Sequence, residues 1–185
     1  MSISAEMERQ ILLERERLTF PPLPTQKATG VGIARFIVSC DSNAFFVLQL
    51  AKEVILIVNK HSLEAWPSLE YWNKILPSQF VSNCLAELTK QEKIEAQIRW
   101  EQLAYNEKIK EAAQDERWTL SSWLSWLEPE EREWFWWNAI QFEPPLENTH
   151  FVIEVTSLDS PFMSGSLKWL FKACGAVDVI SEDDL

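Results

Sequence analysis

Glycine is scarce in this chain, at four of 185 residues. Loops that cradle phosphate groups use glycine because the backbone must approach the ligand closely. Neither a G-x-x-x-x-G-K-[ST] loop nor a G-x-S-x-G nucleophile elbow occurs. The lone Gly30-Val31-Gly32 lies before a predicted strand, which is the wrong place for a dinucleotide fingerprint. These absences count against common nucleotide-binding and hydrolase sites.

Histidine and cysteine are also rare. The histidines are His61 and His150, and the cysteines are Cys40, Cys84 and Cys174. None has the close spacing of a metal-binding motif, so we expect no metal and no cofactor. Three widely spaced cysteines suit reduced thiols, which predicts a cytoplasmic protein.

Long apolar runs and positive charge are lacking as well. The most apolar stretch, residues 44–58, is interrupted by Gln49, Lys52 and Glu53, whereas a membrane span needs about 20 apolar residues. Residues 1–18 are too charged for a secretory signal. The 17 Lys and Arg against 28 Asp and Glu give a net charge of −11, so we expect neither nucleic-acid nor membrane binding.

Hydrophobic residues make up 46% of the chain, enough for one core. We therefore expect a single domain over residues 1–185 with four parts. The first, residues 1–30, is an N-terminal helix followed by a proline-rich strap, Phe20–Pro24. The others are a β-α-β half over 31–60, a helical insertion over 61–148 and a second β-α-β half over 149–185.

The two halves have the same pattern. In the first, a strand over 33–38 precedes a helix over 43–53, and the β-branched run over 54–58 predicts a buried strand. In the second, strands over 151–156 and 177–180 flank a helix over 164–174 that ends at Gly175.

The halves also match at an offset of 118 residues: Ser39, Asp41 and Ser42 correspond to Ser157, Asp159 and Ser160. The predicted fold class is α+β. Two such halves most simply build a ferredoxin-like sandwich, here with a large, Trp-rich helical insertion between them.

The insertion is predicted to be helical throughout. A short helix over 67–76 ends at Pro77, and Ser78 is predicted to cap a second. The pattern of Thr89 and Glu92 predicts a capping box for a long helix that runs toward Trp118. Its narrow apolar stripe includes Ile94, Ile98, Tyr105, Ile109 and Ala112. A short helix begins at Thr119 or Ser121, and Pro129 predicts the first turn of a final helix over 129–143.

Tryptophan is abundant, at ten residues, and six lie within residues 118–137. If residues 134–137 are helical, their indole rings point in several directions, so one packing surface can hardly bury them all. Exposed tryptophans beside acidic residues are typical of protein interfaces. The candidate partner-binding residues are Trp123, Trp126, Trp134, Trp136 and Trp137. Two alternatives are that the rings form the insertion's own core or line a ligand or pigment pocket.

For catalysis the sequence offers only a weak candidate, Cys40, which precedes the predicted helix N-terminus. Backbone N–H groups there favour a thiolate, but the neighbouring Asp41 disfavours it. We therefore assign no catalytic residue and do not expect an enzyme.

The leading hypothesis is a noncatalytic interaction module: an acidic cytosolic adaptor, assembly factor or inhibitor that binds a protein partner through an aromatic helical surface. A basic surface on that partner would complement the acidic charge. The alternatives are a small-ligand sensor and, third, a cysteine-dependent enzyme. A homodimer is conceivable because the fold leaves an edge strand.

Overall fold

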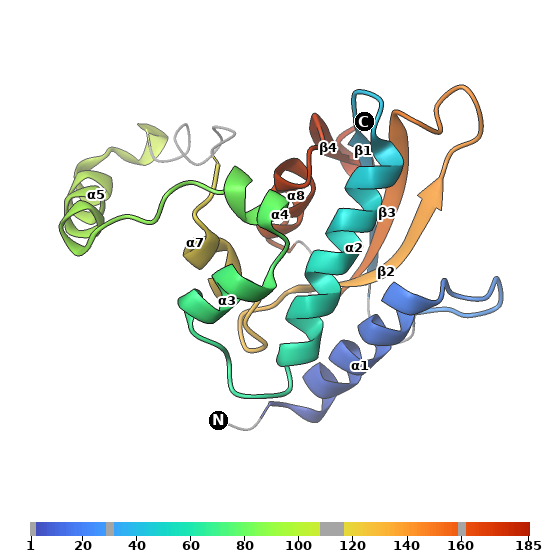
Figure 1. Ribbon diagram of the computed structural model, residues 1–185, viewed down its shortest axis with the longest axis horizontal. Helices are drawn as coiled ribbons and strands as arrows, with labels where there is room; N and C mark the ends of the chain where they lie inside the picture. Colours follow the sequence, from blue (N-terminus) through green and yellow to red (C-terminus); the bar gives the residue numbers. More distant parts are fainter. Residues whose placement is uncertain (1–2, 29–31, 108–116, 159–161) are drawn as a thin grey trace.

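The chain folds into a four-stranded antiparallel sheet and a set of helices, an α+β arrangement (Figure 1). This computed structural model describes residues 3–28, 32–107, 117–158 and 162–185. The strands are β1 (Gly32–Ser39), β2 (Trp134–Gln141), β3 (His150–Ser157) and β4 (Asp178–Ser181). The helices are α1 (Ala5–Thr19), α2 (Ala44–His61), α3 (Leu69–Ile75), α4 (Ser78–Asn83), α5 (Lys90–Gln102), α7 (Leu120–Ser125), α8 (Gly165–Ala173) and the 3-10 turn η1 (Glu182–Asp184).

The strand order is β2-β3-β1-β4, and every neighbouring pair is antiparallel. β1, β3 and β4 lie where the sequence predicts strands. β1 and β3 also differ by 118 positions at both ends, the offset of the predicted repeat. Asp159 and Ser160, which belong to that match, lie outside the described residues.

The predicted strand over 54–58 is wrong, because α2 continues through it to His61. Val54, Ile55 and Val58 are 0% exposed, so this part of the helix is buried on most of its circumference. A helix buried in this way carries an unbroken apolar run that resembles a central strand. The first β-α-β half therefore has no second strand within residues 31–60.

The fourth strand comes instead from the end of the insertion, where a helix was predicted. β2 alternates its side chains: Trp134 and Trp136 face the main core, while Phe135 packs beside Arg132 on the other side. Both faces are apolar at this end of the strand, so the polar-apolar alternation that usually marks a strand is missing. A β-bulge between Trp136 and Asn138 shifts the register with β3.

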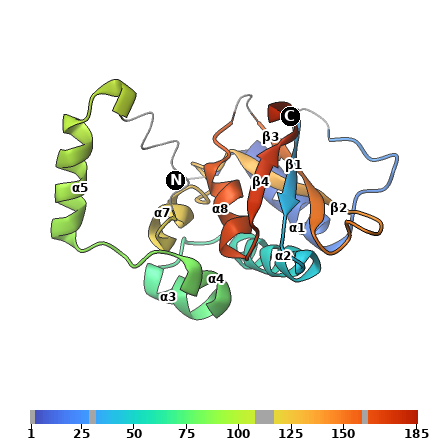
Figure 2. The ribbon, with the colours of Figure 1, turned by 90° about the horizontal axis from the view of Figure 1, so that it is seen from above.

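The main core lies between one face of the sheet and the helices α2 and α8 (Figure 2). The sheet contributes alternate residues such as Phe36, Val38 and Ile153, and α8 contributes Leu167, Leu170 and Phe171. Gly175 ends this helical segment with φ 107°, a left-handed backbone conformation that favours glycine. The other face of the sheet is called the outer face below.

α1 lies along the β2 edge of the sheet. Its N-cap is Ser4, whose side chain accepts a hydrogen bond from the Met7 N–H. The outward-pointing N–H of Trp136 donates to the Glu14 carboxylate at 2.7 Å, so α1 satisfies an edge group that would otherwise be open to another strand. After α1, the strap leads to β1, and Leu23 N–H donates to the Gln26 side chain.

The helices α3, α4 and α7 form a smaller layer beside α8. Trp72 of α3, Phe80 of α4 and Trp123 of α7 are at most 1% exposed and extend the core. α3 ends before Pro77, as predicted, and α4 begins at Ser78 with Pro77 in the cap position. Within the described ranges, no helix combines the length and apolar character needed to cross a bilayer.

Candidate functional site

The tryptophans proposed as partner anchors are mostly buried. Trp123, Trp134 and Trp136 are at most 1% exposed and Trp137 is 5% exposed. Trp126 is half-buried against the core. The expectation that these rings remain on the surface is wrong, because residues 134–137 form a strand that distributes its side chains over two packed faces.

Two of the buried rings have hydrogen-bond partners for their ring N–H groups, whereas the buried Trp136 Nε1–H has none among the described residues. The Trp123 Nε1–H donates to the Ser166 carbonyl, and the Trp134 Nε1–H donates to Ser166 Oγ, each at 2.9 Å. The Arg17 guanidinium lies 5.6 Å from the centre of the Trp137 ring. Buried indoles that are hydrogen-bonded in this way stabilise the fold and are not available as exposed anchors for a partner.

Cys40 lies in the core at 6% exposure. Burial, and secondarily the charge of Asp41, raises the pKa of its thiol to about 11. A thiol with that pKa is almost entirely protonated at neutral pH, so Cys40 is a poor nucleophile. The histidines make local contacts: His61 packs against Tyr71 and Trp72, and His150 Nδ1 is 2.8 Å from Thr149 Oγ1.

The insertion does present one surface, the helix α5. The arm is defined here as residues 88–102, which carry α5 and the turn before it. It extends away from the rest of the molecule (Figures 1 and 2). None of the 13 residues of α5 is buried. A helix of this length is marginally stable in water by itself, so the arm is the least supported of the long helices.

The N-terminus of α5 carries the predicted capping box, which is confirmed. The Thr89 N–H donates to Glu92 Oε2 at 2.7 Å, and the Glu92 N–H donates to Thr89 Oγ1 at 3.2 Å. These bonds from Thr89 hold the pKa of the Glu92 carboxyl below its ordinary value. The capping box fixes where the helix begins without help from the rest of the fold.

Ile94 and Ile98 form an apolar pair on one face of α5. They are four positions apart, so they lie one above the other, and they are 53% and 49% exposed. Glutamines border the pair and are held by hydrogen bonds along the helix, Gln91 to Glu95 and Gln97 to Glu101. Ala96 lies on the opposite side of the helix, on the same side as Trp100, which is 40% exposed.

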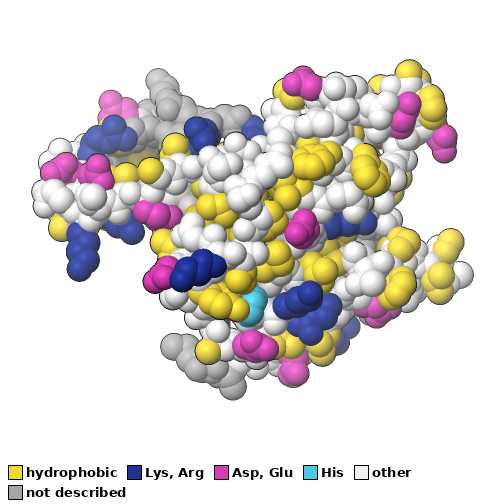
Figure 3. Space-filling view, viewed as in Figure 1, with side chains coloured by type: hydrophobic (Ala, Val, Ile, Leu, Met, Phe, Trp, Pro, Cys, Tyr) yellow, Lys and Arg dark blue, Asp and Glu magenta, His cyan; other side chains and the backbone are white. Residues whose placement is uncertain are grey.

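Charge on α5 is balanced, unlike that of the whole chain. Three basic residues, Lys90, Lys93 and Arg99, match three acidic ones, Glu92, Glu95 and Glu101. Figure 3 shows both signs mixed on the arm, at the left of the view. Apolar contacts rather than net charge would therefore dominate recognition by this helix.

The two ends of the segment that carries the arm are held together at its base. Leu85 and Thr119 form a parallel β-bridge, and the Leu85 N–H donates to the Trp118 carbonyl at 2.9 Å. The Arg117 Nε donates to the Asn83 carbonyl, and the Ser121 N–H donates to Glu87 Oε1. These contacts hold together the two ends of the segment that carries the arm, although α5 itself makes few contacts with the rest of the molecule.

The sequence predicted the start of this helix but neither its end nor its exposure. The predicted helix runs toward Trp118, whereas α5 ends at Gln102; Ile109 and Ala112 lie outside the described residues. The apolar stripe of α5 contains only two isoleucines among 13 residues, which is narrower than the stripe of a helix that packs on a core. That narrowness is the signal by which the arm could have been recognised.

One cavity of about 320 Å³ lies beside the first half of β1. Phe36 and Phe162 meet there edge to face, with ring centres 6.1 Å apart, and Asp183 and Asp184 also line the cavity. Across the described ranges no three His, Cys, Asp or Glu side chains come together in a way that could hold a metal ion.

No family model, curated protein or solved structure matches this chain. What it does must therefore be inferred from its own residues.

Proposed function

We propose that this chain is a noncatalytic protein-interaction module whose α5 arm docks into an apolar groove on a partner protein. The observation that carries the proposal is the exposure of the whole of α5, with Ile94 and Ile98 aligned on one face. Helices bound in grooves use apolar anchors at this spacing.

The energetics of the arm favour such a role. A helix with no buried residue gains no stability from packing on the fold. The entropic cost of ordering it is therefore offset mainly when a partner covers its apolar side. The two isoleucine side chains are about half exposed, so covering them would contribute roughly 1.5–3 kcal/mol before the costs of association. The base contacts between residues 83–87 and 117–121 reduce those costs by holding together the two ends of the segment that carries the arm.

We further infer that the sheet and its two core helices form a ferredoxin-like arrangement. Two observations support this: the order of elements is β1-α2-β2-β3-α8-β4, and the strand order is β2-β3-β1-β4 with antiparallel pairing. The insertion that carries the arm lies between α2 and β2. A cytosolic location is part of the proposal and is supported by three free cysteines.

Single substitutions on opposite sides of α5 test the proposal. Ile94→Asp and Ile98→Asp place a charge on the apolar side, and Ala96→Asp places the same charge on the other side as a matched control. All three change exposed residues of one helix, so we expect melting temperatures close to that of the unaltered protein. Capture experiments from lysate of the source organism, with quantitative mass spectrometry, compare the three variants.

We expect one or more proteins captured by the unaltered chain and by Ala96→Asp to be lost with Ile94→Asp and Ile98→Asp. Equal capture by all variants would contradict a role for the apolar side of α5. A large drop in melting temperature for Ile94→Asp alone would show that the arm packs on the body and is not free to bind.

The cavity beside β1 favours a second candidate function, sensing of a small ligand. Its volume lies at the lower end of the range for small-molecule sites. Its aromatic pair and two carboxylates would suit a small cation with an apolar part. Such a ligand should raise the melting temperature through mass action, and an unchanged value at millimolar concentrations of a panel of amines would count against this function.

A further inference from the structure

The register of the four strands aligns one apolar row across the whole outer face of the sheet. Ile140 pairs with Val152, Val152 with Ile37, and Ile37 with Ile180. Side chains at these positions point away from the main core, because their neighbours Ile153, Val38 and Val179 point into it. One residue from each strand thus contributes to a continuous apolar row.

A charged row lies next to it on the same face. The Arg35 guanidinium lies 3.3 Å from Glu154 and 3.2 Å from Glu182, and the Asn138 amide donates to Glu154 at 3.1 Å. From β2 to the turn after β4, the row therefore reads amide, negative, positive, negative. Arg35 is 42% exposed and Glu182 is 34% exposed, while Glu154 is 19% exposed, so solvent reaches each charge of the row to a different extent.

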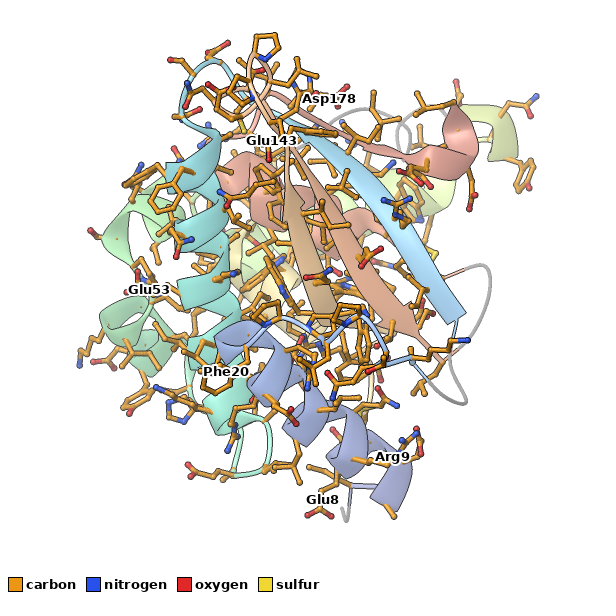
Figure 4. All side chains as sticks on the ribbon, turned by 90° about the vertical axis from the view of Figure 1, so that its right-hand side faces the viewer. Glu8, Arg9, Phe20, Glu53, Glu143 and Asp178 are labelled. Atoms are coloured by element: carbon orange, nitrogen blue, oxygen red, sulfur yellow. The ribbon has the colours of Figure 1, made fainter. Side chains whose placement is uncertain are left out.

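Within the described chain, helices leave this part of the outer face uncovered. Figure 4 looks onto the face: Asp178 and Glu143 mark its upper end, while Glu8 and Arg9 mark α1 at the lower end. The strap after α1 crosses only the lower part of the sheet. Ile140, at one end of the apolar row, is 37% exposed, and Ile37 and Ile180 are half-buried, whereas Val152 is only 3% exposed. The row therefore offers Ile140, Ile37 and Ile180 to a partner.

We propose that this face binds a second copy of the chain, with the two-fold axis parallel to the strands and between β3 and β1. Such an axis places β1 of one copy over β3 of the other and keeps the rows aligned. The apolar row then lies on itself, with Val152 opposite Ile37 and Ile140 opposite Ile180.

The charged row is complementary to itself under the same rotation. Arg35 of each copy lies opposite Glu154 of the other, and Glu182 lies opposite Asn138. Every opposed pair is therefore an ion pair or an amide with a carboxylate, although the chain as a whole is strongly acidic. This charge pattern is the reason to choose a second copy as the occupant.

Sheets packed face to face lie about 10 Å apart and are rotated by about 30° because each sheet is twisted. That rotation displaces the outer pairs most and the pairs beside the axis least. Arg35 with Glu154 is the charged pair beside the axis and should contribute most, because Val152, opposite Ile37, is already buried within its own chain.

The size of the face predicts weak association. Four strands about 4.8 Å apart, and about three rows of side chains, cover roughly 400 Å² on each copy, about half of a standard interface. We therefore expect a dissociation constant in the micromolar range.

Sedimentation equilibrium of the full chain tests the proposal at concentrations from about 5 to about 500 µM, the range expected for an interface of this size. We expect the average mass to rise from monomer towards dimer. Arg35→Glu alone and Glu154→Arg alone each oppose like charges twice, so each should weaken dimerisation at least tenfold. Arg9→Glu is the matched control: Arg9 is also paired, with Glu6 on α1, but lies away from the face, so its reversal should leave dimerisation unchanged.

Mixing the two reversed chains separates contacts between copies from contacts within one. Arg35→Glu chains and Glu154→Arg chains repel their own kind but complement each other, so their mixture should dimerise where neither does alone. Ile140→Asp, at an exposed end of the apolar row, provides a variant that leaves both charges intact and should also lose dimerisation.

A monomeric protein at the highest concentration would overturn the proposal. So would a dimer that the Arg35 and Glu154 reversals leave intact, or a mixture that associates no better than its components. Capture of a different protein through this face, with no self-association, would assign the face to another partner. None of these outcomes bears on the α5 arm.

Discussion

Glu14 on α1 and Arg132, 118 residues later in the chain, form an ion pair in which both side chains are 0% exposed. The Glu14 carboxylate also accepts hydrogen bonds from the Trp136 N–H and the Asn59 side chain, each at 2.7 Å. Arg132 in turn donates from Nε to the Trp134 carbonyl at 3.0 Å. This network joins α1, α2 and the start of β2.

Glu14→Gln should destabilise the protein by about 3 kcal/mol or more, because it leaves the buried guanidinium without a counter-charge. Urea denaturation at neutral pH measures the change. Glu8→Gln removes an exposed carboxylate from the same helix and should have little effect. A loss for Glu14→Gln below about 1 kcal/mol would show that Arg132 finds another partner or reaches water.

Trp136→Ala should destabilise the fold by about 3–5 kcal/mol, because it removes a large ring from the core and leaves a cavity. Trp136 is 1% exposed and packs against Phe171. Tyr105→Ala, at a residue 77% exposed, serves as the control and should leave the melting temperature nearly unchanged. Similar melting temperatures for both variants would contradict the burial of β2.

Gly175→Ala should destabilise the protein by about 1 kcal/mol, because a residue with a Cβ is strained at the positive φ of this position. The added methyl group would meet only ordinary contacts, the nearest at 3.5 Å, so the cost comes from the backbone. Gly32→Ala tests the same exchange at a strand position where the nearest atom is 4.0 Å away. There we expect a neutral or slightly favourable effect, and equal losses at both sites would contradict this explanation.

Alkaline pH should weaken the fold through its buried thiols. Burial raises the pKa of Cys40 and of Cys84 to about 11. A thiol in the unfolded chain has a pKa of about 8.5, so the folded state binds more protons between these values. The contribution of the thiols is therefore complete below about pH 8.5 and is lost as the pH rises through 11.

Urea denaturation at pH 7.5, 9 and 10.5, with Cys40→Ala for comparison, isolates this effect. Lys52 has a pKa lowered by burial and acts in the opposite direction, so the comparison of the two proteins is more informative than either slope. Cys40→Ala should lose less stability with rising pH. Equal slopes of stability against pH for the two proteins, or rapid alkylation of Cys40 by iodoacetamide near neutral pH, would contradict this prediction. Either result would show that the Cys40 thiol is accessible and that its pKa is not raised.

Local sequence patterns were sufficient where an element is defined by its own ends. The capping box of Thr89 and Glu92, the helix stop at Pro77 and the glycine after α8 each depend on a few adjacent residues. They were less reliable for apolar runs. The run over 54–58 is equally compatible with a buried strand and a buried helix, and only the packing around α2 decides between them.

The outer face could not be predicted for a different reason. Ile37, Ile140, Val152 and Ile180 come from four separate strands, and a shift of one residue in any pairing would move its side chain to the other face. No local pattern specifies that register. It is set by which hydrogen bonds and core contacts can form together.

The sequence by itself determined the acidic charge, the few titratable residues suited to catalysis, the capped helix starts and three of the four described strands, because composition and capping depend only on the chain and its near neighbours. Only the tertiary structure decided that the tryptophans become core and that α5 is exposed. The identity of an aromatic residue does not indicate which surface of the protein will cover its side chain. Its burial depends on whether its segment pairs as a strand with another far away in the chain, and that pairing placed Trp134 and Trp136 beneath α8.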